Sequence, residues 1–294
     1  MKTLLQLFDE WFYYHLFLRR IFGKKVKDVD LLELRDNLDQ LAPVIFLSTG
    51  RCGTKWLNTV FSKEKSSVSL HHPIPVMRSQ AKVAYSFEFA KCSDNEQLLL
   101  QEMFLGGREE LFLRAEKSKK NLIFTDSRMT FFAEVIRSIF PKAKFVHLHR
   151  HPGEVVRSGL RRRWYVEENQ SDLNRIEPLP HSSFHQQWEE FDSIEKNAWL
   201  WNETNRWISA FLEQVPERQK MSLSFNDWSV DTIQSLCSFC EVQISDQVIE
   251  RRLNVSVNRQ KSVAIPPFRD WNQEDQEKVR RLCSEMATHL NYSI

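Results

Sequence analysis

The chain is poor in cysteine and carries almost no net charge, and each scarcity excludes a class of protein. Its 294 residues include five cysteines. Their irregular spacing and odd number do not suit a disulfide framework and fit a reducing compartment such as the cytoplasm. The formal net charge at pH 7 is +2, so the chain as a whole has no electrostatic reason to bind nucleic acid. Any preference for anions must therefore be local.

A cysteine pair with zinc-like spacing is present only once. Cys237 and Cys240 form a lone C-x-x-C with no second pair and no nearby histidine. Structural zinc sites need four such ligands. Both cysteines fall on the apolar face of an expected helix, so we expect them to pack in the core.

Long uninterrupted apolar runs are also missing. Residues 1–25 come closest to such an apolar run, but Asp9 and Glu10 interrupt them and no small-residue cleavage site follows. Neither a signal peptide nor a membrane span is expected. The apolar residues recur at helical spacing and predict an amphipathic helix that packs on the domain. Peripheral contact with a membrane surface is the alternative, because aromatic residues precede a basic cluster. The cluster consists of Arg19, Arg20, Lys24 and Lys25.

Strand-like and helix-like patterns alternate along the rest of the chain. Strands are expected at 44–47, within 66–75, and at 121–125, 143–149 and 221–225. Helices are expected at 55–61, 94–118 (loosened at Gly106 and Gly107), 129–140, 152–164, 184–214, 230–241, 245–252 and 273–290. A long polar loop is expected at 166–183. The alternation predicts an α/β fold with a mostly parallel central sheet flanked by helices. We expect one domain at 41–294, preceded by an N-terminal helix and linker at 1–40.

The segment VIFLSTGRCGTKWL, residues 44–57, reads as a buried strand, a tight turn and the start of a helix. Such a turn directs free N–H groups and the positive end of the helix dipole at one point, which suits phosphate. Arg51 and Lys55 add two charges. A P-loop would end G-K-S/T, but Trp56 follows the lysine, so no hydroxyl occupies the metal position. A phosphatase loop starting at Cys52 would need arginine where Asn58 stands. We therefore expect a phosphate site without a metal.

A second strand-to-helix turn follows about 100 residues later. Here the strand ends in Arg150, Pro152 opens the helix, and Ser158 lies about two turns in. Arg150 can bind a phosphate with its fork of N–H groups, and Ser158 can donate a hydroxyl. The two turns indicate a ligand with two separated phosphates. An ordinary corner with solvated arginines is the alternative.

These motifs resemble those of one family. STGRCGTKWL resembles the 5′-phosphosulfate loop, T-G-R-S-G-T-T-W-L, of the sulfotransferases that use 3′-phosphoadenosine 5′-phosphosulfate (PAPS). FVHLHRHPGEVVRSGLRRRWY looks like the 3′-phosphate motif of the same family. Residues 257–279 are similar to the segment that closes over the nucleotide in bacterial-type members. The resemblance implies a P-loop-like fold, release of the product PAP, no metal, and a small-molecule or carbohydrate acceptor.

The resemblance also implies a role for each matching residue. Arg51 matches the catalytic cation that binds the bridging oxygen of the leaving phosphate, with Lys55 beside it. The 5′-phosphosulfate cradle would comprise Arg51, Cys52, Gly53, Thr54, Lys55 and Trp56, the last approaching the adenine. Arg150 and Ser158 match the 3′-phosphate pair, and Arg259 and Lys261 match further cations. Two departures stand out, since Cys52 replaces a serine and Lys55 replaces a threonine.

Sulfuryl transfer also benefits from a general base for the acceptor. His71 and His72 end the second expected strand, which we expect to lie next to the phosphate loop. Related sulfotransferases carry H-E-P here. His72 takes the place of the glutamate, and a neutral imidazole suits the role of base.

Other polar and aromatic residues receive secondary roles. Asp126 and Ser127 end the third strand and are expected to touch the acceptor or support the loop. His147 and His149 are expected to be hydrogen-bonded core residues. Most of the tryptophans at 188, 199, 201 and 207 are expected in the core, with one or two lining the acceptor pocket.

The sequence therefore predicts a sulfotransferase that moves a sulfuryl group from PAPS to an acceptor hydroxyl or amine. Two alternatives stay open. One is a nucleotide kinase or other NTPase, and the other is a non-catalytic module that binds a membrane surface.

Overall fold

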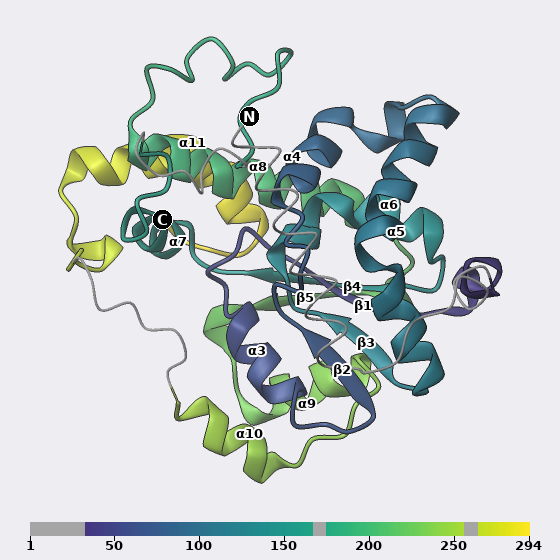
Figure 1. Cartoon of the computed structure of the whole chain (residues 1–294). Coiled ribbons are helices and arrows are strands. Elements are labelled where there is room, and N and C mark those ends of the chain that lie inside the picture. The colour runs from purple at the N-terminus through teal and green to yellow at the C-terminus, as the bar shows by residue number, and fades with distance from the viewer. Residues whose placement is uncertain (1–32, 167–174, 256–263) are drawn as a thin grey trace.

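The computed structural model describes residues 33–166, 175–255 and 264–294. Five strands form one sheet in which every pairing is parallel, in the order β2-β3-β1-β4-β5 (Figure 1). The strands are β1 (Val44–Leu47), β2 (Ser67–Leu70), β3 (Asn121–Phe124), β4 (Lys144–His149) and β5 (Lys220–Ser224). All five lie where the sequence predicts them. The carboxyl ends of parallel strands share one edge, which is where ligands bind in such folds.

Helices cover both faces of this sheet. The α-helices are α3 (Thr54–Phe61), α4 (Arg78–Phe87), α5 (Asp94–Lys117), α6 (Ala133–Ile139), α7 (Pro152–Leu160), α8 (Ser193–Glu213), α9 (Val230–Phe239), α10 (Asp246–Leu253) and α11 (Gln273–His289). Short 3-10 helices are η1 (Leu38–Gln40), η2 (Phe89–Lys91), η3 (Ser127–Phe132), η5 (Glu217–Gln219), η6 (Phe225–Asp227) and η7 (Phe268–Asp270). The fold is α/β with a parallel central sheet, as predicted.

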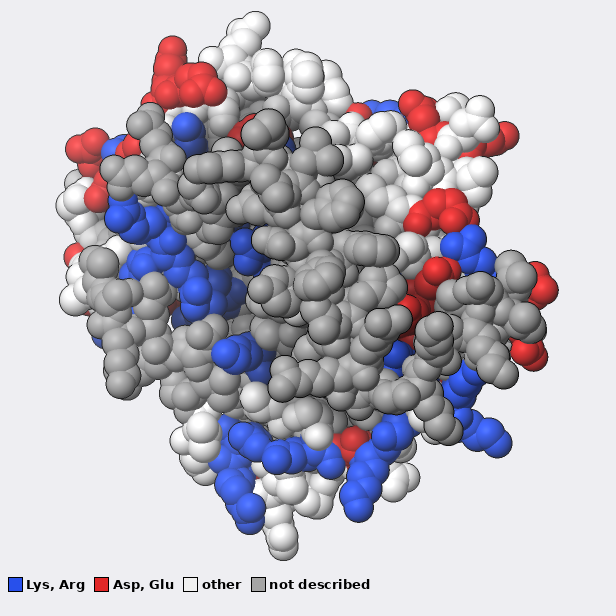
Figure 2. Space-filling model, in the orientation of Figure 1, with Lys and Arg blue, Asp and Glu red and all other residues white. Residues whose placement is uncertain are grey.

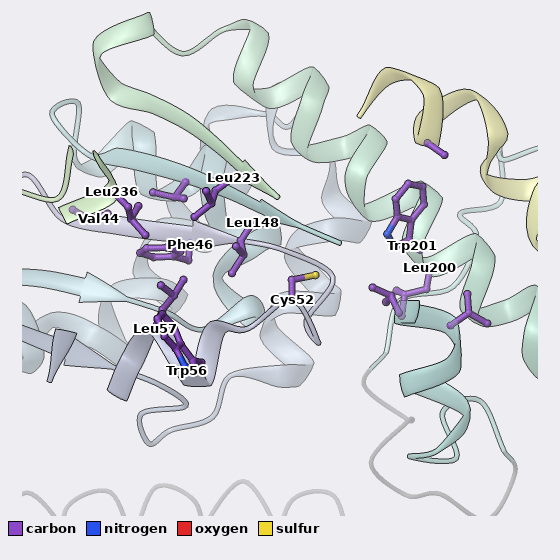
Figure 3. Packing of buried hydrophobic residues seen from close by; sticks show 14 of the residues in the cluster. Val44, Phe46, Cys52, Trp56, Leu57, Leu148, Leu200, Trp201, Leu223 and Leu236 are labelled. Carbon is purple, nitrogen blue, oxygen red and sulfur yellow. The ribbon is translucent and has the colours of Figure 1, made fainter. Parts of the chain in front are cut away.

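Strand β1 shows why a continuous apolar run was needed. Side chains alternate between the two faces of a strand, and both faces are covered here. Val44 and Phe46 join the cluster beneath α3, α7 and α9, whereas Ile45 and Leu47 join the cluster beneath α4, α5 and α6. In Figure 3, Phe46 points toward neighbouring side chains of α3 and β4 on the first face.

Three expectations about the elements need correction. Helix α5 runs unbroken through Gly106 and Gly107, because Gly107 allows close packing against Met77: a Cβ there would lie 2.7 Å from the Met77 sulfur. Helix α8 begins at Ser193 rather than near 184, since Asp192 and Glu195 form a capping box. The expected helix at 129–140 is divided into η3 and α6. Helix α4 was not anticipated.

The order of the strands also corrects a prediction. β2 was expected to lie next to the loop that follows β1, but β3 lies between them. Sequence patterns identify strands, whereas their order depends on tertiary packing.

Outside the sheet, residues 33–40 pack onto the domain. Leu34 and Leu38 are buried in the cluster with α5, and Arg35 forms ion pairs with Glu102 and Glu109 of that helix. The expected N-terminal helix at 1–25 lies outside the described residues. No helix within the described ranges is long and apolar enough to cross a membrane. All five cysteines are free, and Cys237 and Cys240 are buried, as expected.

Candidate active site

The loop between β1 and α3 takes an unusual backbone path. Gly50, Arg51 and Gly53 all have left-handed φ angles, of 81°, 64° and 94°. Glycine is required at 53 for a second reason, because a Cβ there would lie 2.2 Å from the Trp228 ring. The Leu57 N–H is the first to reach a helical acceptor, the Gly53 carbonyl, at 3.0 Å. The amides just before it therefore have no acceptor within the helix and are available to an anion.

The two predicted phosphate motifs meet directly. β1 and β4 are neighbours in the sheet, so the turns that follow them lie side by side. Arg51 Nε donates a hydrogen bond to Ser158 Oγ at 2.8 Å, and Arg150 Nη1 donates to the Arg51 carbonyl at 3.3 Å. The motifs thus form one continuous surface.

The Arg150 side chain is held in place by several contacts. Its guanidinium lies over the Phe225 ring, 4.6 Å from the centroid, and 3.5 Å from a Glu154 oxygen. The indole N–H of Trp201 donates to the Arg150 carbonyl at 2.9 Å. Arg150 Nε is buried and has no hydrogen-bond partner among the described residues. Arg150 is therefore held in position at the end of β4, and its Nε–H can donate a hydrogen bond to a ligand.

Both motifs open into one cavity of about 1080 Å³ at the carboxyl edge of the sheet. Among its described lining residues are ten cations, Arg51, Lys55, Arg78, Lys82, Arg128, Arg150, Arg157, Arg161, Arg162 and Arg175. Glu154 is the one carboxylate in that lining. Lys and Arg side chains also gather on the surface over α7 (Figure 2).

This crowding of like charges acts on Arg51. Burial lowers its pKa to about 10, with further lowering by Arg162 and Arg150. Cations that repel one another in this way are stabilised by a bound anion. The cavity is therefore suited to a ligand of high negative charge.

The carboxylate of Glu154 binds a later part of the chain. It lies 3.0 Å from Arg157 and accepts a hydrogen bond from the Phe268 N–H at 3.3 Å. Arg157 Nε donates to the Ile265 carbonyl at 2.9 Å. Burial would raise the pKa of Glu154, but the Phe268 N–H and Arg157 outweigh it and hold that pKa below its ordinary value. The described part of the expected nucleotide-closing segment thus packs on α7.

The cations expected from that segment, Arg259 and Lys261, lie outside the described residues.

Aromatic side chains form another wall of the cavity. Trp56 and Trp228 have ring centroids 4.6 Å apart, and Trp228 lies 4.7 Å from Phe225. The Trp56 indole N–H donates to the Arg252 carbonyl at 2.9 Å, which fixes that ring. All three rings line the cavity, so they offer a surface to a flat heterocycle. Sequence reasoning selected Trp56 and missed Phe225, which ends a predicted strand, and Trp228, three residues beyond it.

His71 and His72 line the same cavity as Arg51 although β3 intervenes. Their rings stack at 4.0 Å, and His71 Nδ1 lies 2.8 Å from the Thr125 carbonyl. His72 has a left-handed φ of 57°, and its Nε2 lies 3.5 Å from the buried Asp126 carboxylate. Asp126, from the end of β3, therefore orients this imidazole. An oriented imidazole facing a cavity is the usual arrangement of a general base.

The charge state of His72 is also set by its surroundings. Its side chain is 43% exposed, and desolvation of the remainder lowers its pKa to about 3, with further lowering by Arg128, His71 and Arg78. The imidazole is therefore neutral near pH 7 and can accept a proton. Negative charge bound nearby would raise that pKa and strengthen the base.

Cys52 faces away from the cavity. Its thiol is buried in the core and donates to the Gly50 carbonyl at 3.2 Å. Burial raises the pKa of that thiol, which disfavours a nucleophile. Cys52 can therefore contribute its backbone, but not its thiol, to a phosphate cradle.

The core histidines are confirmed as hydrogen-bonded. His147 Nε2 contacts Asn205 at 2.9 Å, and His149 Nδ1 contacts the Tyr292 hydroxyl at 2.8 Å.

The expectation that one or two helix tryptophans line the pocket is wrong. Those at 188, 199 and 201 are buried in the core, the one at 207 packs against it partly buried, and the described lining has Trp164 instead. Sequence reasoning also missed Arg78, Lys82 and Arg128, which belong to none of the recognised motifs.

Comparison with known proteins agrees with these features. A family model described as "Sulfotransferase family" matches residues 43–246. The sulfotransferase domain from the curacin biosynthetic pathway is 17% identical, with 86% of this chain and 99% of that chain covered at a TM-score of 0.51. Sulfotransferase STF9 from Mycobacterium avium is 13% identical, with 90% and 82% covered at 0.49.

A sulfotransferase from Alicyclobacillus acidocaldarius is 14% identical, with 86% of this chain and 97% of that chain covered at a TM-score of 0.46. No curated protein matches the sequence. The likeness to the curacin domain shows the fold. Because the family match extends over most of the chain, from the first strand to the start of α10, the chain belongs to the sulfotransferase family.

Proposed function

We propose that this sulfotransferase uses PAPS as donor and transfers its sulfuryl group to a hydroxyl or amine of a small-molecule or carbohydrate acceptor, without a metal. The observation that carries the proposal is the hydrogen bond from Arg51 to Ser158 at 2.8 Å. It brings the loop expected at the 5′-phosphosulfate and the helix expected at the 3′-phosphate into one cation-lined cavity. A ligand with two phosphates on one ribose is what such a surface fits.

The chain's own residues supply each contact that such a nucleotide needs. The amides at the start of α3, with Arg51 and Lys55, would hold the 5′ end. Arg150 and Ser158 would hold the 3′-phosphate. The wall formed by Trp56 and Trp228 would face the adenine.

The chemistry requires little more than position and charge. When bound, PAPS supplies the sulfuryl group, whose sulfur bonds to the acceptor oxygen as its bond to the 5′-phosphate oxygen breaks and PAP leaves with that electron pair. Arg51 and Lys55 stabilise the negative charge that grows on the leaving oxygen. His72 accepts the proton of the acceptor hydroxyl.

Asp126 determines which nitrogen of His72 acts. A carboxylate 3.5 Å from Nε2 favours the tautomer with the proton on that nitrogen. Nδ1 then carries the lone pair that accepts the acceptor's proton, and Asp126 stabilises the imidazolium that forms.

A melting experiment tests the donor. PAP at 100 times its dissociation constant should stabilise the fold by about 2.7 kcal/mol. AMP, which lacks the 3′-phosphate, should give a much smaller shift at the same concentration. EDTA should change neither shift. Equal shifts from PAP and AMP, or a shift with ATP that needs magnesium, would contradict the proposal and favour a kinase-like enzyme.

A further inference from the structure

The cavity extends beyond the residues assigned to the nucleotide. Its volume of about 1080 Å³ lies slightly above the range of about 300–1,000 Å³ for pockets that hold one small ligand. Three of its cations, Arg78, Lys82 and Arg128, belong to neither phosphate motif. They come from α4 and η3, which pack against each other. There is therefore room, and a second charged surface, for another molecule beside the nucleotide.

Arg78 and Arg128 lie near His72, whose pKa their positive charge lowers. Arg78 and Lys82 lie four residues apart on α4 and so share one face of that helix. Lys82 is 3.2 Å from Glu177, and Arg128 is 3.8 Å from the same Asp126 that orients His72. All three residues line the cavity, whereas Glu177 and Asp126 are absent from its described lining.

An apolar surface accompanies the charges. Ala81, between Arg78 and Lys82, lines the cavity together with Phe131. The Phe131 ring is fixed by Tyr85, 5.0 Å away, and by Trp207, 5.4 Å away. A rigid apolar face beside cations is suited to a ring that carries an anionic substituent.

The lining is poorly suited to a neutral sugar. Neutral polyols donate many hydrogen bonds, for which carboxylate and amide oxygens are the strongest side-chain acceptors. Among the described lining residues, Glu154 is the one carboxylate and is already bound by Arg157 and the Phe268 N–H. Asn254 is the one side-chain amide. Cations outnumber such acceptors throughout the cavity.

We propose that the acceptor is itself an anion: a hydroxylated ring compound whose carboxylate, sulfate or phosphate is bound by Arg78, Lys82 and Arg128, with its reacting hydroxyl at His72 and its ring on Phe131. This inference rests on the proposed function, because it names the substrate class of the same site. The transferred group and the proton follow the path already described.

Matched acceptor pairs test the inference. Methyl glucuronoside, its methyl ester and methyl glucoside share one ring and differ in charge, and hexose 6-sulfate and hexose 6-phosphate distinguish the kind of anion. Sulfuryl transfer from labelled PAPS should favour the charged members by about tenfold or more in kcat/KM, as expected for a charge-assisted contact. Equal or better rates with the neutral members would overturn the inference.

Variants of the α4 cations test whether the preference for charged acceptors arises from Arg78 and Lys82. Arg78→Gln and Lys82→Gln should each remove most of the preference for charged acceptors and leave PAP affinity unchanged. Arg218→Gln is the matched control, because Arg218 is exposed beside the amino-terminal end of β5, away from the carboxyl edge. A preference that survives in both α4 variants would place the anion elsewhere and contradict the assignment.

Binding measurements separate this inference from the donor proposal. Calorimetry with the glucuronoside and its ester, with and without PAP, needs no turnover. Tighter binding of the carboxylate, weakened by Arg78→Gln, supports the inference even if PAP and AMP prove equivalent. Equal binding of the two compounds in both states overturns it while leaving a PAP-over-AMP preference intact.

Discussion

The two ends of the cavity are built in different ways. The loop end, formed by Arg51, Lys55, Arg150 and Ser158, lies on turns that follow the two central strands β1 and β4. The histidine end is formed by His71, His72, Arg78, Lys82 and Arg128. His71 and His72 follow the edge strand β2, Arg78 and Lys82 lie on α4, and Arg128 lies on η3, which follows β3. The loop end uses the same local structure twice, a turn from a strand into a helix. The histidine end is assembled from segments that share no sequence motif. We therefore expect the loop end to bind a fixed ligand and the histidine end to determine which acceptor reacts.

The largest expected effect is at the histidine end. His72→Ala should lower kcat by about 10² to 10⁴, the usual cost of losing a general base, with PAP affinity largely unchanged. His71→Ala is the matched control, since its Nδ1 is engaged by the Thr125 carbonyl. It should cost much less. Steady-state kinetics and PAP calorimetry measure both, and an active His72→Ala enzyme beside an inactive His71→Ala enzyme would transfer the role to His71.

The second-largest expected effect is the loss of a cation at the loop end. Arg51→Ala should lower kcat by about 10² or more, because charge grows on the leaving oxygen mainly in the transition state. PAP affinity should fall less than kcat. The comparison is Lys55→Ala, whose side chain is exposed. Should Lys55→Ala prove the more damaging of the two, Lys55 rather than Arg51 is the main catalytic cation.

The third prediction concerns recognition at the loop end. Arg150→Ala should remove most of the difference in affinity between PAP and AMP, about ten- to a hundredfold, because a charge-assisted contact to the 3′-phosphate is lost. Ser158→Ala should cost less, since it removes a neutral donor. Titrations with both nucleotides measure the ratio. An unchanged ratio in Arg150→Ala would mean that the 3′-phosphate binds elsewhere.

The smallest effect is a shift in pH dependence at the histidine end. In the proposed mechanism the base is the neutral imidazole of His72, so kcat/KM should fall as pH drops through the pKa of His72. Because that pKa is lowered to about 3, the fall should lie below the ordinary histidine value of 6.5. Arg128→Gln removes a positive charge that disfavours the imidazolium, so it should move the fall toward neutral pH by on the order of one unit. A fall that stays in place or moves to lower pH would show that Arg128 does not act on His72.

The contrast between the two ends also explains what the sequence could predict. The apolar run of β1, the glycines of the loop and the arginine ending β4 are local signals, and the structure places Arg51, Arg150 and Ser158 together as their spacing suggests. Arg78 and Arg128 carry no such signal. They reach the cavity only because α4 packs on η3, which is a tertiary contact.

Orientation was harder to predict than position. Cys52 lies in the expected loop, but its thiol packs into the core because the left-handed residues on either side turn it inward. Helix α8 starts late because the capping signal at Asp192 outweighs the aromatic pattern that continues before it. The backbone path around Cys52 is not visible in residue type, whereas the capping box at Asp192 and Glu195 is a sequence signal that could have placed the start of α8.

The hydrogen bond between Arg51 and Ser158 has a consequence for how the two motifs vary. This hydrogen bond connects residues 107 positions apart in sequence, so a substitution at either position changes the local environment of the other. The effects of Arg51→Ala and Ser158→Ala should then be non-additive, with the double variant losing less than the product of the single losses. Such coupling would make the pair a single epistatic unit, in which a change at one position alters which residues are tolerated at the other.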